Sequence, residues 1–216
     1  MKQMINTVVT DMLTALYQPF MFAVVLAVFF MFLYMYANCP KEAGRGYKAA
    51  IVSWLRQFKN SSFFRRLFVL VLYTSLVLFR TFFNRNLWLN PLSDVCGGWR
   101  MWTYNANGVR VYITDSIENI IMLFPFIILL MWAAKDKLLK NVTFHGIVSK
   151  SLQVSFLFSL SIELFQLFFR VGTFQLSDLF YNTLGGIMGG IVYAIIWRTG
   201  TVSYTHLRAH ETGRNL

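Results

Sequence analysis

The sequence predicts an all-α integral membrane protein with five transmembrane helices, and both its composition and the spacing of its apolar stretches point to this class. Of its 216 residues, 56% are hydrophobic and 18% aromatic, whereas only 13% are charged. Soluble domains carry about 25% charged residues. Five apolar stretches approach the roughly 20 residues that a helix needs to cross the hydrocarbon core. We therefore expect one five-helix membrane domain over residues 1–200.

The five expected spans are separated by polar or basic loops. They cover residues 19–36, 66–83, 116–133, 148–169 and 178–197. The first span is predicted to be an uncleaved anchor, because only Lys2 precedes it as a basic residue and no small-residue cleavage site follows.

The basic residues of the loops predict the orientation, since cytoplasmic loops are enriched in Lys and Arg. The excess falls in the first and third loops, at Lys41, Arg45, Lys48, Arg56, Lys59, Arg65, Arg66, Lys135, Lys137, Lys140 and Lys150. We therefore expect the N-terminus and Cys96 outside, and Cys39 and Arg198 inside. The formal net charge of +11 then reflects topology and affinity for anionic lipid headgroups, not nucleic-acid binding.

Two further segments have the apolar periodicity of helices that lie along a membrane surface. The first is in the first loop, where the apolar positions are Ile51, Trp54, Leu55 and Phe58. With its basic neighbours it is either an amphipathic helix on the inner surface or a solvated loop. The second is at the N-terminus, where the apolar positions are Ile5, Val8, Val9, Met12 and Leu16. It predicts a similar helix on the outer side.

The second loop, residues 84–115, is predicted to lie outside and to contain a small β-hairpin. Asn107-Gly108 is a strong turn signal, and the segments on both sides of it are rich in aromatic and β-branched residues. The Trp and Tyr side chains of this loop are expected at headgroup level. At its end, Asp115 and Glu118 have the spacing of a capping box. Glu118 is therefore interpreted as a helix cap rather than as a catalytic residue.

Residues 161–190 are the most informative for function, because they place polar side chains inside two apolar spans. An ionised side chain at the centre of a membrane helix costs roughly 2.5 to 3.5 kcal/mol, so such residues usually face protein or a wet cavity. At about 100° per residue, each of these spans has one polar or small side. The two sides consist of Ser151, Ser155, Ser159, Glu163, Gln166 and Arg170, and of Asp178, Asn182, Gly185, Gly186, Gly189 and Tyr193. Because a short turn joins the spans, we expect the polar residues to meet Asn119 at one outward-facing concavity.

Small residues and one proline predict how these helices pack. Gly185 and Gly189, and likewise Gly186 and Gly190, have the spacing that lets membrane helices approach closely. We interpret them as contacts within the molecule rather than as a dimer interface. Pro125 is expected to kink the third span. No residues at metal-ligand spacing and no cofactor motif occur, so neither a metal nor a cofactor is predicted.

The end of the chain is predicted not to be natural protein sequence. VSYTHLRAHET, residues 202–212, resembles a translated sequencing adapter. Residues 201–216 are therefore left out of functional reasoning, and the pair His206 and His210 is not interpreted as a metal site.

Three motifs resemble those of the VanZ-like family of bacterial membrane proteins. They are NIIMLFPF (119–126), IELFQLFFR (162–170) and SDLFYNTLGGIMGG (177–190). NPLSDVCGGW (90–99) and Arg80 before it also resemble that family, so the likeness covers about residues 80–197. The motif positions are Asn119, Pro125, Glu163, Gln166, Arg170, Asp178, Asn182 and Gly185. The resemblance implies a multi-pass protein of the bacterial cytoplasmic membrane whose founding members lower susceptibility to the lipoglycopeptide teicoplanin.

Two classes of function follow from the polar cluster. In the preferred one, the protein is not an enzyme and alters how an amphiphilic drug or a lipid-linked cell-wall precursor sits at the outer leaflet. In the other, it is an enzyme acting on a lipid or isoprenoid-linked envelope substrate, with Glu163 as acid or base. A structural ion pair of Arg170 with Asp178 would explain the cluster without any chemistry. A transporter is the weakest option, because the five spans show no obvious inverted repeat.

Overall fold

The computed structural model describes residues 2–38, 46–83, 87–100, 102–104 and 106–212, and within these ranges the side chains of residues 2–4, 12, 15, 16, 112 and 200–212 are not described. Its elements are α1 (Lys2–Tyr17), α2 (Phe20–Asn38), α3 (Tyr47–Asn60), α4 (Ser62–Phe82), β1 (Trp102–Tyr104), β2 (Arg110–Tyr112), α5 (Asp115–Leu138), α6 (Phe144–Phe169) and α7 (Leu176–Thr212). Cys39, Lys41 and Arg45, which contribute to the predicted orientation, lie outside the described residues.

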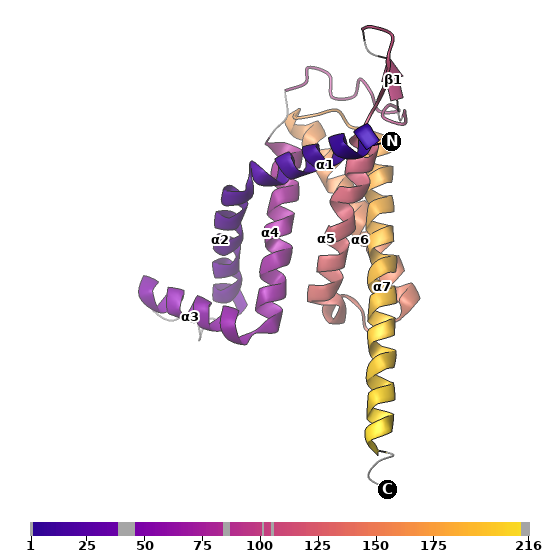
Figure 1. Ribbon diagram of the computed structural model, residues 1–216. Coiled ribbons are helices and arrows are strands. Elements are labelled where there is room, and N and C mark those ends of the chain that lie inside the picture. The colour runs from indigo at the N-terminus through magenta and orange to yellow at the C-terminus, as the bar shows by residue number, and fades with distance from the viewer. Residues whose placement is uncertain (1, 39–45, 84–86, 101, 105, 213–216) are drawn as a thin grey trace.

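The prediction of five membrane-spanning helices is confirmed. The helices long and apolar enough to cross a membrane are Phe20–Asn38, Ser62–Phe82, Asp115–Leu138, Phe144–Phe169 and Leu176–Thr199. In Figure 1 they run roughly alongside one another, so that the α2–α3 and α5–α6 connections lie at one end and the hairpin lies at the other. The protein is therefore a multi-pass membrane protein. Helix α7 continues to Thr212, and the interpretation of residues 201–216 as adapter sequence stays a prediction.

Helices α5, α6 and α7 form one tightly packed unit, because glycines let α7 approach both neighbours. Gly185 and Gly189 face the backbone of α5 at Ile120 and Phe124, where a Cβ atom would collide with a carbonyl group. On the adjacent side, Gly186 and Gly190 face two serines of α6, Ser155 and Ser151. Both small-residue pairs of α7 thus pack within the molecule.

Pro125 lies inside α5, which continues without a break from Asp115 to Leu138. A proline removes a backbone donor and weakens the hydrogen bonds of the preceding turn. The hydroxyl of Tyr73 on α4 donates to the carbonyl of Met122 in that turn, at 2.9 Å. This hydrogen bond also joins α4 to α5, beside a small apolar cluster formed by Val77, Met122 and Ile162.

Helix α2 packs on α4 through one apolar side, and the two helices form a pair beside α5–α7 (Figure 1). Its fully buried residues recur every four positions, at Ala23, Ala27, Met31 and Met35. Aromatic rings extend this contact, as between Phe22 and Phe79, whose centroids lie 5.6 Å apart. The buried polar residues described in this pair are Ser75 and Thr81 of α4, whereas five polar residues are buried along one side of α6.

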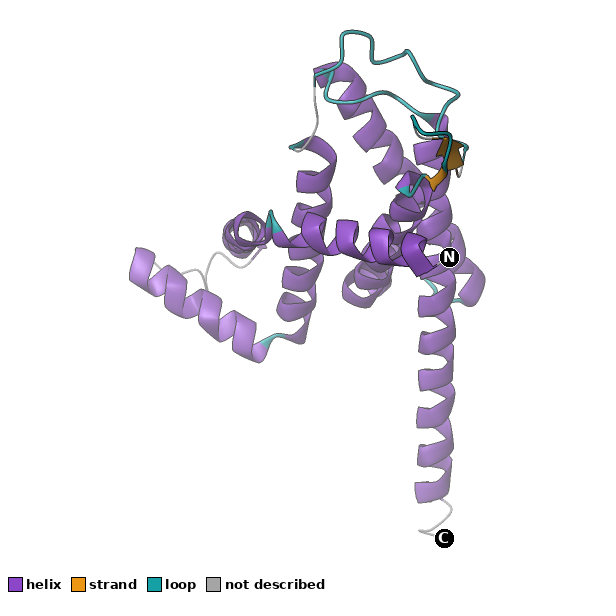
Figure 2. Cartoon of the chain, turned by 45° about the horizontal axis from the view of Figure 1, so that its top comes forward, coloured by secondary structure: helices purple, strands orange, loops and turns teal. Residues whose placement is uncertain are grey.

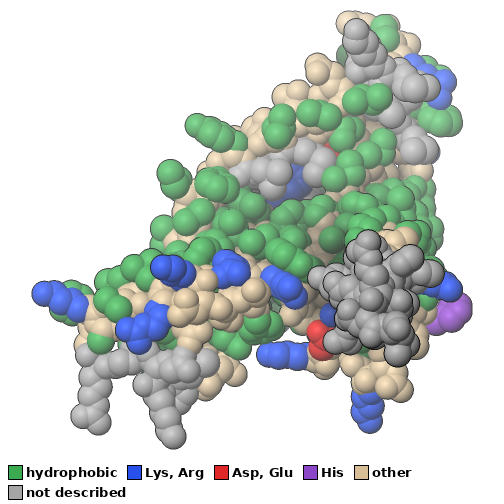
Figure 3. All heavy atoms as spheres, turned by 60° about the horizontal axis from the view of Figure 1, so that its bottom comes forward, with side chains coloured by type: hydrophobic (Ala, Val, Ile, Leu, Met, Phe, Trp, Pro, Cys, Tyr) green, Lys and Arg blue, Asp and Glu red, His purple; other side chains and the backbone are tan. Residues whose placement is uncertain are grey.

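Helices α1 and α3 cross the ends of the bundle instead of spanning it (Figure 1). The first loop does contain a helix, α3, whose Trp54 stacks on Phe58 with ring centroids 5.2 Å apart. Lys and Arg side chains gather on this end of the molecule, beside apolar ones (Figure 3). Helix α1 confirms the N-terminal helix, with Val8 buried and Ile5 and Val9 exposed.

The predicted β-hairpin is confirmed, with Trp102 paired to Tyr112 and Tyr104 paired to Arg110. Gly108 in its turn has φ 71°, which favours glycine. The loop before the hairpin arches over the same end of the bundle (Figure 2). Backbone hydrogen bonds tie it to the α6–α7 turn, from Phe174 N to Pro91 O at 2.9 Å and from Leu176 N to Val95 O at 3.0 Å.

Candidate functional site

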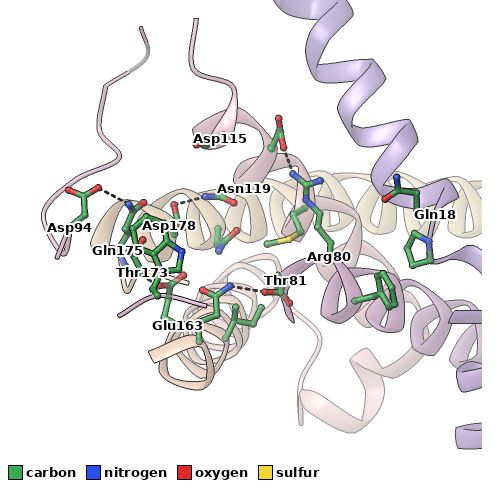
Figure 4. Close-up of a pocket in the computed structure, with 18 residues that line it drawn as sticks. Gln18, Arg80, Thr81, Asp94, Asp115, Asn119, Glu163, Thr173, Gln175 and Asp178 are labelled. Atoms are coloured by element: carbon green, nitrogen blue, oxygen red, sulfur yellow. Dashed lines mark hydrogen bonds and ion pairs between the residues drawn. The ribbon is translucent and has the colours of Figure 1, made fainter. Parts of the chain in front are cut away.

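A polar cavity of about 500 Å³ lies at the hairpin end of the bundle, below the loop of residues 87–100. Its lining comes from the α1–α2 junction, from α4, α5, α6 and α7, and from the two loops that meet above them. The polar lining residues are Gln18, Arg80, Thr81, Asp94, Asp115, Glu118, Asn119, Glu163, Gln166, Thr173, Gln175, Asp178 and Asn182. Figure 4 shows these side chains converging from several helices. Pockets of this size hold small ligands or headgroups.

Arg80 and Glu118 form the ion pair of the site. The guanidinium of Arg80 on α4 donates to Glu118 Oε2 on α5 (Figure 4). The other oxygen of Glu118 accepts from the Thr114 hydroxyl at 2.7 Å. The Glu118 side chain is only 8% exposed, whereas the Arg80 side chain is 35% exposed. The pair joins the α2–α4 half to the α5–α7 half at the depth of the cavity.

Two amide side chains hold the α7 end of the cavity. Asn119 Nδ2 donates to Asp178 Oδ1 at 2.7 Å and so links α5 to α7 (Figure 4). One turn further along α7, Asn182 Nδ2 donates to Ser159 Oγ on α6 at 3.0 Å. Asn182 is 1% exposed, and its Oδ1 is buried without a hydrogen-bond donor in the described part of the structure. An acceptor in that state is costly unless a ligand or water satisfies it.

The polar side of α6 holds the opposite wall. Glu163 is 1% exposed, and its Oε2 accepts from the backbone N–H of Gln175 at 3.0 Å. Gln166 Nε2 donates to the carbonyl of Thr81 on α4 at 2.9 Å. The side chain of Gln175 in turn donates to Asp94 Oδ2, in the loop of residues 87–100, at 2.8 Å. Gln175 in the α6–α7 turn thus contacts the carboxyl groups of both Glu163 and Asp94.

The formal charge of the cavity is negative. Its lining contains five carboxyl side chains, those of Asp94, Asp115, Glu118, Glu163 and Asp178. Among the described residues that line it, Arg80 is the one basic side chain, and its guanidinium is paired with Glu118. Such a wall favours ligands that donate hydrogen bonds or carry positive charge.

Five of the six cluster residues expected from the sequence line this cavity, and Arg170 does not. Helix α6 ends at Phe169, and Arg170 takes a left-handed conformation with φ 56°. Its side chain is exposed, and its carbonyl accepts from Trp88 N at 2.8 Å. The ion pairs of the described residues do not include one between Arg170 and Asp178. A helical projection placed Arg170 on the polar side because it assumed that the helix continued.

The interpretation of Glu118 as a helix cap is wrong. Thr114 is the N-cap residue of α5, and no side-chain hydrogen bond caps that end. Glu118 binds Arg80 instead. The capping-box spacing of Glu118 suggested a cap and so drew attention away from an ion pair. Arg80 lies within a predicted span, and an arginine there indicates a buried acidic partner.

The loop residues of the site were also missed. Asp94, Gln175 and Thr173 lie in segments whose sequence predicts no particular side-chain direction, and Gln18 lies at the α1–α2 junction. Asp94 belongs to NPLSDVCGGW (90–99), and the family resemblance of this motif is the sequence signal that could have indicated its place in the site.

The fold and the site together define a multi-pass membrane protein with a polar, acid-rich cavity at one end of its helix bundle. The model of the VanZ/LLP1 family matches residues 4–197, and the chain belongs to that family. The match begins well before Arg80, so it also covers α2, where no motif was recognised. Comparison with curated proteins and with solved structures found no match.

Proposed function

We propose that the protein acts in the bacterial cytoplasmic membrane, with its cavity on the outer side, and lowers susceptibility to lipoglycopeptides of the teicoplanin type. It does so as a binding protein, by holding part of the drug or of a lipid-linked cell-wall precursor. The observation that carries this proposal is the cavity of about 500 Å³, which concentrates polar side chains inside an otherwise apolar bundle.

The expected orientation places this cavity where such ligands occur. The cavity lies at the end opposite α3, whose exposed Lys48, Arg56 and Lys59 favour the cytoplasmic side. A lipid-linked precursor or a lipoglycopeptide at the outer leaflet then meets the cavity at headgroup depth.

The second candidate is an enzyme that acts on a lipid or isoprenoid-linked envelope substrate. The observation in its favour is Glu163, a buried carboxyl that lines the cavity and is oriented by the Gln175 N–H. A carboxyl held in that way can act as general acid or base. A second group that would activate a nucleophile is not evident among the described residues, so we prefer the binding function.

The test is the teicoplanin susceptibility of a sensitive bacterial host that expresses the full chain or its Glu163→Gln variant. We expect the unaltered chain to raise the minimal inhibitory concentration and the variant to return it to the vector level. The substitution keeps the shape of the side chain, so protein level and thermal midpoint should be nearly unchanged.

Asp136→Asn provides the matched control, because it removes a carboxylate that is 76% exposed, pairs with Lys135 and lies outside the cavity. This variant should protect as well as the unaltered chain. Full protection by Glu163→Gln at normal protein level would overturn the role of the cavity.

A further inference from the structure

We propose that the cavity recognises a primary ammonium group, so that its ligand is an amine-bearing molecule. This inference rests on the proposed function to the extent that it takes the cavity as a binding site, and it adds the chemical class of the ligand. Two independent observations point to it, the charge of the wall and one buried acceptor.

The charge of the wall selects against anions. Five carboxyl groups line the cavity, and the guanidinium of Arg80 is held by Glu118. A phosphate bound here would face several carboxyl groups at short range, and like charges repel one another. The same carboxyl groups attract a cation.

The second observation is the Oδ1 atom of Asn182. Its amide nitrogen is used by Ser159, which leaves an acceptor buried in the cavity wall with no donor among the described residues. A ligand that donates hydrogen bonds satisfies this oxygen, whereas an acceptor such as a phosphate oxygen does not. An ammonium group has three donors and no acceptor.

The neighbours of Asn182 complete the expected binding position. Asp178 lies one turn before it on α7, and Glu163 lies one turn after Ser159 on α6. All three line the cavity. An ammonium held by two carboxylates and an amide oxygen would be bound by charge-assisted hydrogen bonds, which are about twice as strong as neutral ones.

The experiment measures thermal unfolding of the purified full chain in detergent at increasing concentrations of three probes. The probes are phosphatidylethanolamine, its N-acetylated form and free ethanolamine. N-acetylation removes the ammonium group but keeps the phosphate and both acyl chains. We expect the amine probes to raise the unfolding midpoint in a saturable way and the acetylated lipid not to do so.

Variants locate the binding position. Asp178→Asn and Glu163→Gln each remove one charge with little change of shape, and each should weaken the affinity for the amine by about tenfold or more. Asp136→Asn should leave the affinity unchanged. The amine and acetylated lipids are compared on the unaltered chain. The test therefore still gives a result if a variant does not fold.

Each outcome decides the inference. Stabilisation by phosphatidylethanolamine alone would support a lipid amine, and stabilisation by ethanolamine would support a soluble one. Equal stabilisation by the acetylated lipid, no effect of either amine, or full affinity in both carboxyl variants would overturn it. Teicoplanin susceptibility is measured separately, so loss of protection by Glu163→Gln together with absence of amine binding would overturn this inference and leave the proposed function standing.

Discussion

The two halves of the bundle are packed by different means, although both consist of apolar membrane helices. In the α2–α4 pair, alanines, methionines and aromatic rings form the contact. In the α5–α7 unit, backbones touch through glycines, and the buried side of α6 consists largely of serines, Glu163 and Gln166.

This difference shows what a polar cavity requires in a membrane. Lipid tails are as apolar as leucine, so side-chain hydrophobicity alone does not hold membrane helices together. In α5–α7, close glycine contacts and interhelical hydrogen bonds add to a buried apolar cluster that includes Leu123, Ile127 and Ile147. The α2–α4 pair forms one wall of the cavity and provides Arg80, which is paired with Glu118.

The largest effect is expected from Gly185→Ala, which would break the backbone contact of the polar unit. The added methyl group meets the carbonyl of Ile120, which cannot rotate away as a side chain can. Overpacking usually costs about 1 to 3 kcal/mol, and here we expect about 3 kcal/mol or more of unfolding free energy to be lost. Steric trapping in bicelles measures it. Met188→Leu, on an exposed side of α7, is the control and should stay within about 0.5 kcal/mol. A Gly185→Ala protein of normal stability would refute this packing.

The next effect concerns the ion pair that joins the two halves. Arg80→Met leaves the Glu118 carboxylate buried with Thr114 as its described partner, which should lower the unfolding free energy by about 2 kcal/mol. Changing Glu118 to Met as well removes this buried carboxylate, which no longer has an ion-pair partner. The double variant should therefore recover about 1 kcal/mol relative to Arg80→Met. If the unfolding free energies lost in Arg80→Met and in Glu118→Met simply add up in the double variant, the two residues do not form the pair.

The smallest effect tests the position of Arg170 outside the cavity. A left-handed conformation costs an ordinary residue about 1 kcal/mol that glycine does not pay. Arg170→Gly should therefore raise the unfolding free energy by up to about 1 kcal/mol. Arg100→Gly removes an exposed arginine from the loop before the hairpin without relieving a left-handed conformation, so it should not raise the unfolding free energy. Marked destabilisation by Arg170→Gly would restore the interpretation of Arg170 as an ion-pair partner.

Much of the fold could be predicted from the sequence because its signals are local. Each span needs about 20 apolar residues, and the Asn107-Gly108 turn is a short-range hairpin signal. The polar side of α6 could be predicted as well, since the helix is regular from Ser151 to Gln166.

The remaining features depend on where elements end and how they meet. Arg170 follows the last residue of α6, so the periodicity no longer applies to it. Arg80 and Glu118 are 38 residues apart, and no local pattern relates them. The contact of Asp94 with Gln175 joins two loops whose paths are decided by tertiary packing.

The most direct test of the central claim, that the cavity faces the outside of the cell, uses Cys96. This cysteine is exposed and lies two residues after Asp94, which lines the cavity. In a Cys39→Ser background, Cys96 is the one thiol of the chain. An impermeant maleimide added to intact cells should label it as fully as after the membrane is opened. Labelling only after opening would place the cavity on the cytoplasmic side and contradict the account.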